Sequence, residues 1–221
     1  WPLFWRSGLC PRAIYPLPPA PEESFTVLEK AFPKRYDCFG QLLRSYIFTD
    51  GSGGSVGSDR RRRRCGWSVV QVDAEGAAIG VLTGSIGGPI QTVPRAELIA
   101  VIKALDNIPG EITLWSDCKY VVDGMHKLEF RPNKPLPKKN RTLWIDARRL
   151  LAARASEFII HKVLAHATHK DVKDGKLSAW ERLGNHVADR YAGDAADRYA
   201  IDSRLLERLD ELDTVSSEVL K

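Results

Sequence analysis

The sequence predicts an α/β fold in which a mixed five-stranded sheet carries helices on both faces. Three strand-like segments follow one another between residues 43 and 83, whereas the later strand-like segments alternate with helical patterns. Strands joined by turns pair as an antiparallel meander, and strands joined through helices extend a sheet in parallel. The chain has 221 residues, 43% hydrophobic and 28% charged, which suits one sizeable domain with extensions.

The elements are expected in a fixed order along the chain. Strands are predicted at 43–49, 66–73 and 77–83, and a helix opens at Pro94 because apolar residues recur at helical spacing from Leu98 to Leu105. A buried strand at 112–115, a helix capped by Ser116 and Asp117, and a helix at about 142–155 come next. The pattern ends with a strand at 157–164, a long polar loop at 165–183 and a last core helix at about 185–200.

Two flanking regions differ in composition from the predicted domain at 43–200. Residues 1–42 are rich in proline and are expected to be a connector, with one short helix at about 24–31. Residues 201–221 form an acidic amphipathic tail with three leucines on one side, which is expected to dock on the core or on a missing neighbour. The chain opens on Trp1 and its one methionine is Met125, so we expect an internal piece of a longer polypeptide.

Four carboxylates fall in four separate elements of this pattern. They are Asp50, Glu97, Asp117 and Asp189. Each alone has an ordinary explanation, because Asp favours turns and acids complement helix N-termini. Each nevertheless lies beside apolar residues, in the segments YIFTD, RAELIAVI, LWSDCKYVV and GNHVADRYA, rather than on a polar face.

Five short motifs appear in order on these elements: TDGSGG, RAEL, LWSDCKYV, AHATH and GNHVAD. Over roughly residues 43–200 the chain resembles the type 1 ribonuclease H domains attached to retroelement reverse transcriptases. The resemblance implies a ribonuclease H-like fold in which Asp50 and Asp117 converge from neighbouring parallel strands. It also implies an endonuclease that hydrolyses the RNA strand of RNA/DNA hybrids, leaving 5′-phosphate and 3′-hydroxyl ends.

The resemblance assigns the catalytic acids to Asp50, Glu97, Asp117 and Asp189, and a proton relay to His166, with His169 as its competitor. The acids would hold two Mg²⁺ ions, for which Mn²⁺ can substitute, with Asp50 bridging both. Carboxylates are the ligands that such hard cations prefer, and no CxxC pair indicates zinc. Because two copies of ADRYA occur, Asp197 is the rival of Asp189; eight residues on a helix are about 80° and 12 Å apart, so both cannot reach one metal pair.

Contacts with nucleic acid are also implied by the resemblance. The backbone of Gly51, Ser52 and Gly53 and the side chain of Thr92 would meet ribose and phosphate, while Val93 and Pro94 stand where some relatives present polar groups. The basic insert at 131–141 would grip the DNA strand, through cations that include Lys138, Lys139 and Arg141. A second basic block, Arg60–Arg64, suggests a polyanionic partner; a nuclear-localisation signal and a solvated surface stay open as alternatives.

Two other functions remain open: a binding module with a degraded site, and a DNA-acting nuclease or transposase of the same fold. The presence of all four acids disfavours the first, and the loop histidine with RAEL disfavours the second. The predicted partners are an RNA/DNA hybrid and an upstream polypeptide such as a polymerase, with no membrane and no small-molecule cofactor. No apolar run is long enough for a bilayer and the N-terminus does not resemble a signal peptide, so an intracellular location, nucleus or cytoplasm, is expected.

Overall fold

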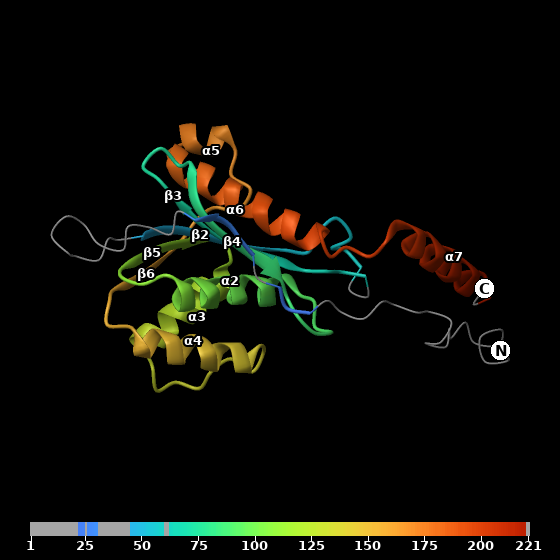
Figure 1. Ribbon diagram of the computed structural model, residues 1–221, viewed down its shortest axis with the longest axis horizontal. Coiled ribbons are helices and arrows are strands. Elements are labelled where there is room, and N and C mark those ends of the chain that lie inside the picture. Colours follow the sequence, from blue (N-terminus) through green and yellow to red (C-terminus); the bar gives the residue numbers. More distant parts are fainter. Residues whose placement is uncertain (1–21, 25, 31–44, 60–61, 220–221) are drawn as a thin grey trace.

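A six-stranded mixed sheet forms the centre of the molecule (Figure 1). The computed structural model describes residues 22–24, 26–30, 45–59 and 62–219. The strand order is β1-β4-β3-β2-β5-β6. The strands are β1 Thr26–Lys30, β2 Ser45–Ser52, β3 Gly66–Val72, β4 Ala78–Ser85, β5 Ile112–Ser116 and β6 Phe158–Lys162.

The five strands expected from the sequence are all present with the expected directions. β2, β3 and β4 form an antiparallel meander, and β5 and β6 extend the sheet in parallel from β2. The parallel register pairs Thr49 with Ser116. Asp50 and Asp117 therefore follow paired residues on neighbouring strands that run in the same direction, which places them at the same end of the sheet.

The sixth strand is a correction to the sequence analysis. Residues 26–30 form β1, which pairs antiparallel with β4 at the edge of the sheet, so the helix expected over residues 24–31 is wrong there. Pairing with an open sheet edge satisfies backbone groups that an isolated short helix would leave to water. The Ser85 amide donates to Ser24 Oγ at 2.8 Å, just before this strand. The rest of the predicted connector, residues 1–21 and 31–42, lies outside the described residues.

The helices form layers on the two faces of the sheet (Figure 1). They are α2 Val93–Asn107, α3 Lys119–Phe130, α4 Arg141–Ala153, α5 His169–Lys173, α6 Ala179–Asp197 and α7 Ser203–Val219. α2 packs on β2, β3 and α4 on one face, around Trp67, Leu98 and Trp144. α6 crosses β2, β3 and β4 on the other face, above Phe48 and Val70.

The polar segment at 165–183 is more ordered than the sequence analysis expected. It contains α5, and α6 begins at Ala179 rather than near Asn185. Both helices open with a capping box, Thr168 with Asp171 and Ser178 with Glu181. These S/T-x-x-D/E spacings signal helix starts in the sequence. Asp189 therefore lies in the middle of α6 rather than near its start, where a helix beginning at about residue 185 would place it.

The C-terminal tail is a helix, α7, that extends beyond the end of the sheet (Figure 1). Leu209 is buried, and Leu205 and Leu212 are partly buried, as the amphipathic pattern indicated. Among the described residues, no helix has both the length and the apolar character needed to cross a membrane.

Candidate active site

Three carboxylates from three different elements meet at the end of the sheet where β2 and β5 finish. Asp50 comes from β2, Glu97 from α2, and Asp117 from the residue after β5. One oxygen of each lies within 4.8 Å of the others. The sequence motifs point to all three residues, and the structure brings them together.

Gly51 allows α2 to come this close to β2. A Cβ at position 51 would lie 2.5 Å from the backbone nitrogen of Glu97 and 2.9 Å from Ala96, closer than side-chain carbons approach. Any larger residue would push α2 away and take Glu97 with it. The glycine after Asp50 is thus required by packing, in addition to shaping the turn.

Burial and repulsion from neighbouring carboxylates both disfavour the charged forms of Asp50 and Glu97. Asp50 is 5% exposed, and burial, followed by the charges of Asp117 and Asp189, raises its pKa to about 7. Burial, then Asp50 and Asp117, raises the pKa of Glu97 well above its ordinary value, although Lys162 and the Gly51 amide oppose this. Such a group calls for a cation to balance it.

The donor set fits a hard divalent cation. All three groups offer carboxylate oxygens, and Glu97 Oε2 is buried without a hydrogen-bond partner among the described residues. An unpaired buried acceptor is costly, and coordination of a cation removes that cost. Oxygen ligands of this kind suit Mg²⁺ or Mn²⁺ better than zinc.

Asp189 stands at the side of this cluster. It is not among the three acids within 4.8 Å of one another, but its charge raises the pKa of Asp50. It lines a pocket of about 220 Å³ together with His166, Asn185 and His186. The sequence-predicted acid and the sequence-predicted loop histidine thus share one cavity wall.

His166 has an unusual backbone conformation in this wall. Its φ is 47°, in the left-handed region that residues other than glycine rarely occupy, and its side chain is exposed. Strain of this sort costs about 1 kcal/mol or more and is concentrated at functional sites. His169 is instead the first residue of α5 and does not line this pocket.

Asn185 is a site residue that the sequence analysis did not select. Its Nδ2 donates to Asp117 Oδ2 at 3.3 Å, and the residue is only 5% exposed. Its Oδ1 has no hydrogen-bond partner in the described structure. The signal was present in GNHVAD, because residues 185 and 189 are four apart and lie on one helix face.

The residues around β2 and α2 that are predicted to contact nucleic acid are mostly buried or hydrogen-bonded within the protein. Gly51 is buried, and its amide supports the charged forms of Asp50 and Glu97. Thr92 is the N-cap of α2, and its hydroxyl oxygen is buried without a partner among the described residues. Ser52 Oγ accepts from the Gly54 amide at 3.2 Å.

The basic insert between α3 and α4 is exposed, as a nucleic-acid contact requires. Lys138, Lys139 and Arg141 all have exposed side chains. The segment is anchored to the domain by Tyr120, whose hydroxyl donates to the Lys139 carbonyl at 3.1 Å and accepts from Trp144 Nε1 at 2.7 Å. Exposed cations on an anchored segment suit contact with a phosphate backbone.

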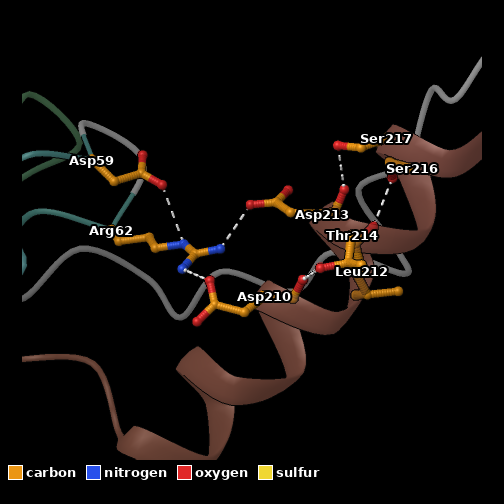
Figure 2. Close-up of polar contacts among 8 residues, drawn as sticks. All are labelled: Asp59, Arg62, Asp210, Leu212, Asp213, Thr214, Ser216 and Ser217. Atoms are coloured by element: carbon orange, nitrogen blue, oxygen red, sulfur yellow. Dashed lines mark hydrogen bonds and ion pairs between the residues drawn. The ribbon is translucent and has the colours of Figure 1, made fainter. Parts of the chain in front are cut away.

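The other basic block is partly committed to contacts within the protein (Figure 2). Arg62 is 7% exposed and forms ion pairs with Asp59, Asp210 and Asp213, the last at 2.7 Å. Arg64 is also buried, and its Nη1 donates to the carbonyl of Arg63. The expectation that the whole Arg60–Arg64 block faces a polyanion is therefore wrong for these two residues; Arg60 and Arg61 lie outside the described residues.

The fold and the site define an α/β protein with a carboxylate site for divalent cations at the carboxyl end of a central strand. The family model described as RNase H matches residues 44–197. A ribonuclease H from Erythrobacter litoralis (strain HTCC2594) is 33% identical over 162 residues, which cover 68% of this chain and 94% of that protein. The chain therefore belongs to the ribonuclease H family.

Solved structures show the same fold. The ribonuclease H domain of PFV superposes with a TM-score of 0.53 at 22% identity, covering 73% of this chain and 99% of that domain. The protease-reverse transcriptase of prototype foamy virus gives a TM-score of 0.51 at 21% identity. That match covers 72% of this chain and 21% of the viral protein.

Proposed function

We propose that the chain hydrolyses the RNA strand of RNA/DNA hybrids. The observation that carries the proposal is the buried group of Asp50, Glu97 and Asp117, beside the pocket that Asp189 and His166 line. Its membership of the ribonuclease H family supports this choice of reaction and substrate. A pure binding module would have no need to keep such acids together against their repulsion.

The carboxylates of Asp50, Glu97, Asp117 and Asp189 would hold two divalent ions, Mg²⁺ by preference. When bound, such ions lower the pKa of a water and neutralise charge on the leaving oxygen. Asn185 would keep the Asp117 carboxylate oriented through its hydrogen bond. His166 would transfer a proton or help the product leave, because its imidazole, which can accept and donate protons, is exposed at the pocket.

Substrate choice would depend on the shape of the hybrid and on the 2′-hydroxyl groups of its RNA strand. The exposed cations Lys138, Lys139 and Arg141 would contact the DNA strand, and the segment from Gly51 to Gly53, with Thr92, would lie near the RNA. The buried Thr92 hydroxyl would first have to become accessible.

The domain organisation belongs to the same proposal. Residues 43–200 would be the catalytic domain, to whose sheet β1 adds an edge strand, with the rest of residues 1–42 as a connector and 201–221 as a tail. An upstream polymerase would be the natural neighbour; the foamy virus structure is a precedent for this fold inside a protease-reverse transcriptase chain.

The test compares the cleavage of three duplexes that have the same base sequence and one labelled strand each: an RNA/DNA hybrid, a DNA duplex and an RNA duplex. We expect cleavage of the RNA in the hybrid alone, with Mg²⁺ or Mn²⁺ and not with a chelator. Asp50→Asn should abolish cleavage and retain hybrid binding. Preferred cleavage of the DNA duplex would instead identify a DNA-acting nuclease, and binding of the hybrid without cleavage would identify a binding module.

A further inference from the structure

The second ADRYA segment has no place in the proposed chemistry, yet its aspartate makes a specific contact. Asp197 is the last residue of α6 and is exposed. Its Oδ1 accepts a hydrogen bond from the backbone amide of Ser55 at 2.9 Å. Ser55 lies in the loop that follows β2, five residues after Asp50 in the sequence.

The loop is shaped to meet this end of α6. Gly54 has a φ of 66°, and a Cβ there would lie 3.0 Å from Asp197 Oδ1 and 3.1 Å from the Ala196 side chain. At the other end of the loop, a Cβ on Gly66 would lie 2.3 Å from the Ala196 nitrogen. Both ends of the loop therefore press directly against the last turn of α6.

The position of this loop matters to substrate binding under the proposed function, on which this inference rests. The loop directly follows the segment from Gly51 to Gly53, and we place the backbone of that segment beside the RNA strand. Ser52 Oγ accepts from the Gly54 amide, so the segment is linked to the residue that contacts α6. Asp197 thus fixes the loop from outside, without reaching the acid cluster.

We propose that Asp197 is a positioning residue that holds the Gly51–Ser55 segment in its substrate-binding conformation. A charged acceptor strengthens a hydrogen bond to a backbone amide. Without it, the loop must be ordered when the substrate binds, and ordering a flexible segment weakens binding. The four acids are carried by β2, by α2, by the residue after β5 and by the middle of α6, so their geometry should not change.

The test measures steady-state cleavage of a hybrid by Asp197→Ala, Asp197→Asn and wild type. Asp197→Ala should raise KM about tenfold, the size expected when a hydrogen bond to a charged group is lost, with kcat within about twofold. Asp197→Asn keeps an oxygen acceptor and should stay near the wild-type KM. Asp194→Ala is the matched control, because Asp194 is an exposed acid one turn earlier on the same helix.

Amide hydrogen exchange of Ser55 provides the second readout. Exchange should be slow in wild type and in Asp197→Asn, and at least about tenfold faster in Asp197→Ala. Cleavage by Asp197→Ala with an unchanged KM, or an equal KM increase in Asp194→Ala, would overturn the inference. If the wild type cleaves no hybrid, the proposed function fails, and the Ser55 exchange rates still decide whether Asp197 holds the loop.

Discussion

Asp50 and Glu97 are buried to an extent that acids reach only when something compensates them. They are 5% and 4% exposed, with Asp117 close to both, and burial raises the pKa of each. Asp189 and His166 are more accessible and face the pocket beside this group. At the scale of single residues the site therefore has a buried group of acids, which we propose to hold the cations, and a more accessible pocket wall beside it.

Asp189 is predicted to be essential despite its position outside the three-acid cluster. Asp189→Asn should lower hybrid cleavage by about 10² or more, because the proposed function uses this carboxylate to hold a catalytic cation. Asp194→Asn, five residues later and exposed on the same helix, should leave the rate close to wild type. Single-turnover cleavage assays give the comparison, and wild-type rates for Asp189→Asn would remove Asp189 from the ligand set.

His166 should make a smaller contribution than any acid. His166→Ala is expected to slow turnover by at most about 10², the range of a single proton-transfer group. His169→Ala should do less, because His169 does not line the pocket. Steady-state rates over a range of pH would measure both, and a larger loss for His169→Ala would show that the two roles have been exchanged.

The two basic segments near the site differ in how their cations are placed. The insert between α3 and α4 keeps its cations exposed on an anchored base, whereas Arg62 is held by the carboxylates of α7 and by Asp59 (Figure 2). Charge clusters that look alike in sequence are thus exposed in one case, where we propose that they contact the substrate, and paired with the carboxylates of a helix in the other.

Replacing the exposed cations should change the salt dependence of hybrid binding. In Lys138→Ser/Lys139→Ser/Arg141→Ser, the slope of log affinity against log salt should become shallower by about 2 to 3, because each lost phosphate contact contributes about 0.9 on a B-form duplex. Arg62→Ser is the matched control, because it removes a cation that forms ion pairs within the protein. It should leave the slope unchanged and lower the free energy of unfolding by about 1 kcal/mol.

Binding titrations at several salt concentrations, with thermal unfolding of the same proteins, separate these effects. A shallower slope for Arg62→Ser would mean that Arg62 leaves α7 to contact the substrate. An unchanged slope for the triple variant would remove the insert from the substrate interface.

For the molecule as a whole, the fold holds like charges together at a cost in stability. The pKa of Asp50 is raised from 3.8 to about 7, so between these values the folded state retains a proton that the unfolded state has lost. Stability contributed by this group is present below pH 3.8 and is lost as the pH rises toward 7. A bound divalent cation reverses the penalty, because it favours the ionised, folded form.

The metal-free wild type should therefore lose stability relative to Asp50→Asn as the pH rises from 3.8 to about 7. The difference should approach a few kcal/mol at most, since one pKa unit corresponds to about 1.4 kcal/mol. Millimolar Mg²⁺ should raise the Tm of the wild type at pH 7 and have a much smaller effect on the variant. Thermal unfolding with and without chelator tests this, and equal Mg²⁺ shifts in both proteins would argue against a cation at Asp50.

The sequence by itself determined the order of the five main strands and the principal helices, and its motifs singled out the three acids that the structure brings together. These are local properties: apolar periodicity, a Gly/Ser turn after Asp50, and short motifs with fixed spacing. The signal for the start of α6 is also local, because the capping pair of Ser178 and Glu181 predicts it. The family resemblance and the family match therefore rest on information carried by contiguous segments.

Tertiary structure alone decided the features that depend on residues far apart in the chain. The pairing of β1 with the β4 edge replaces the helix expected there, because a sheet edge supplies hydrogen bonds that local propensity cannot anticipate. The ion pairs of Arg62 with α7 and the hydrogen bond between Ser55 and Asp197 join residues more than 140 positions apart. No local pattern encodes such contacts, since they arise only when the packed sheet brings both partners to one place.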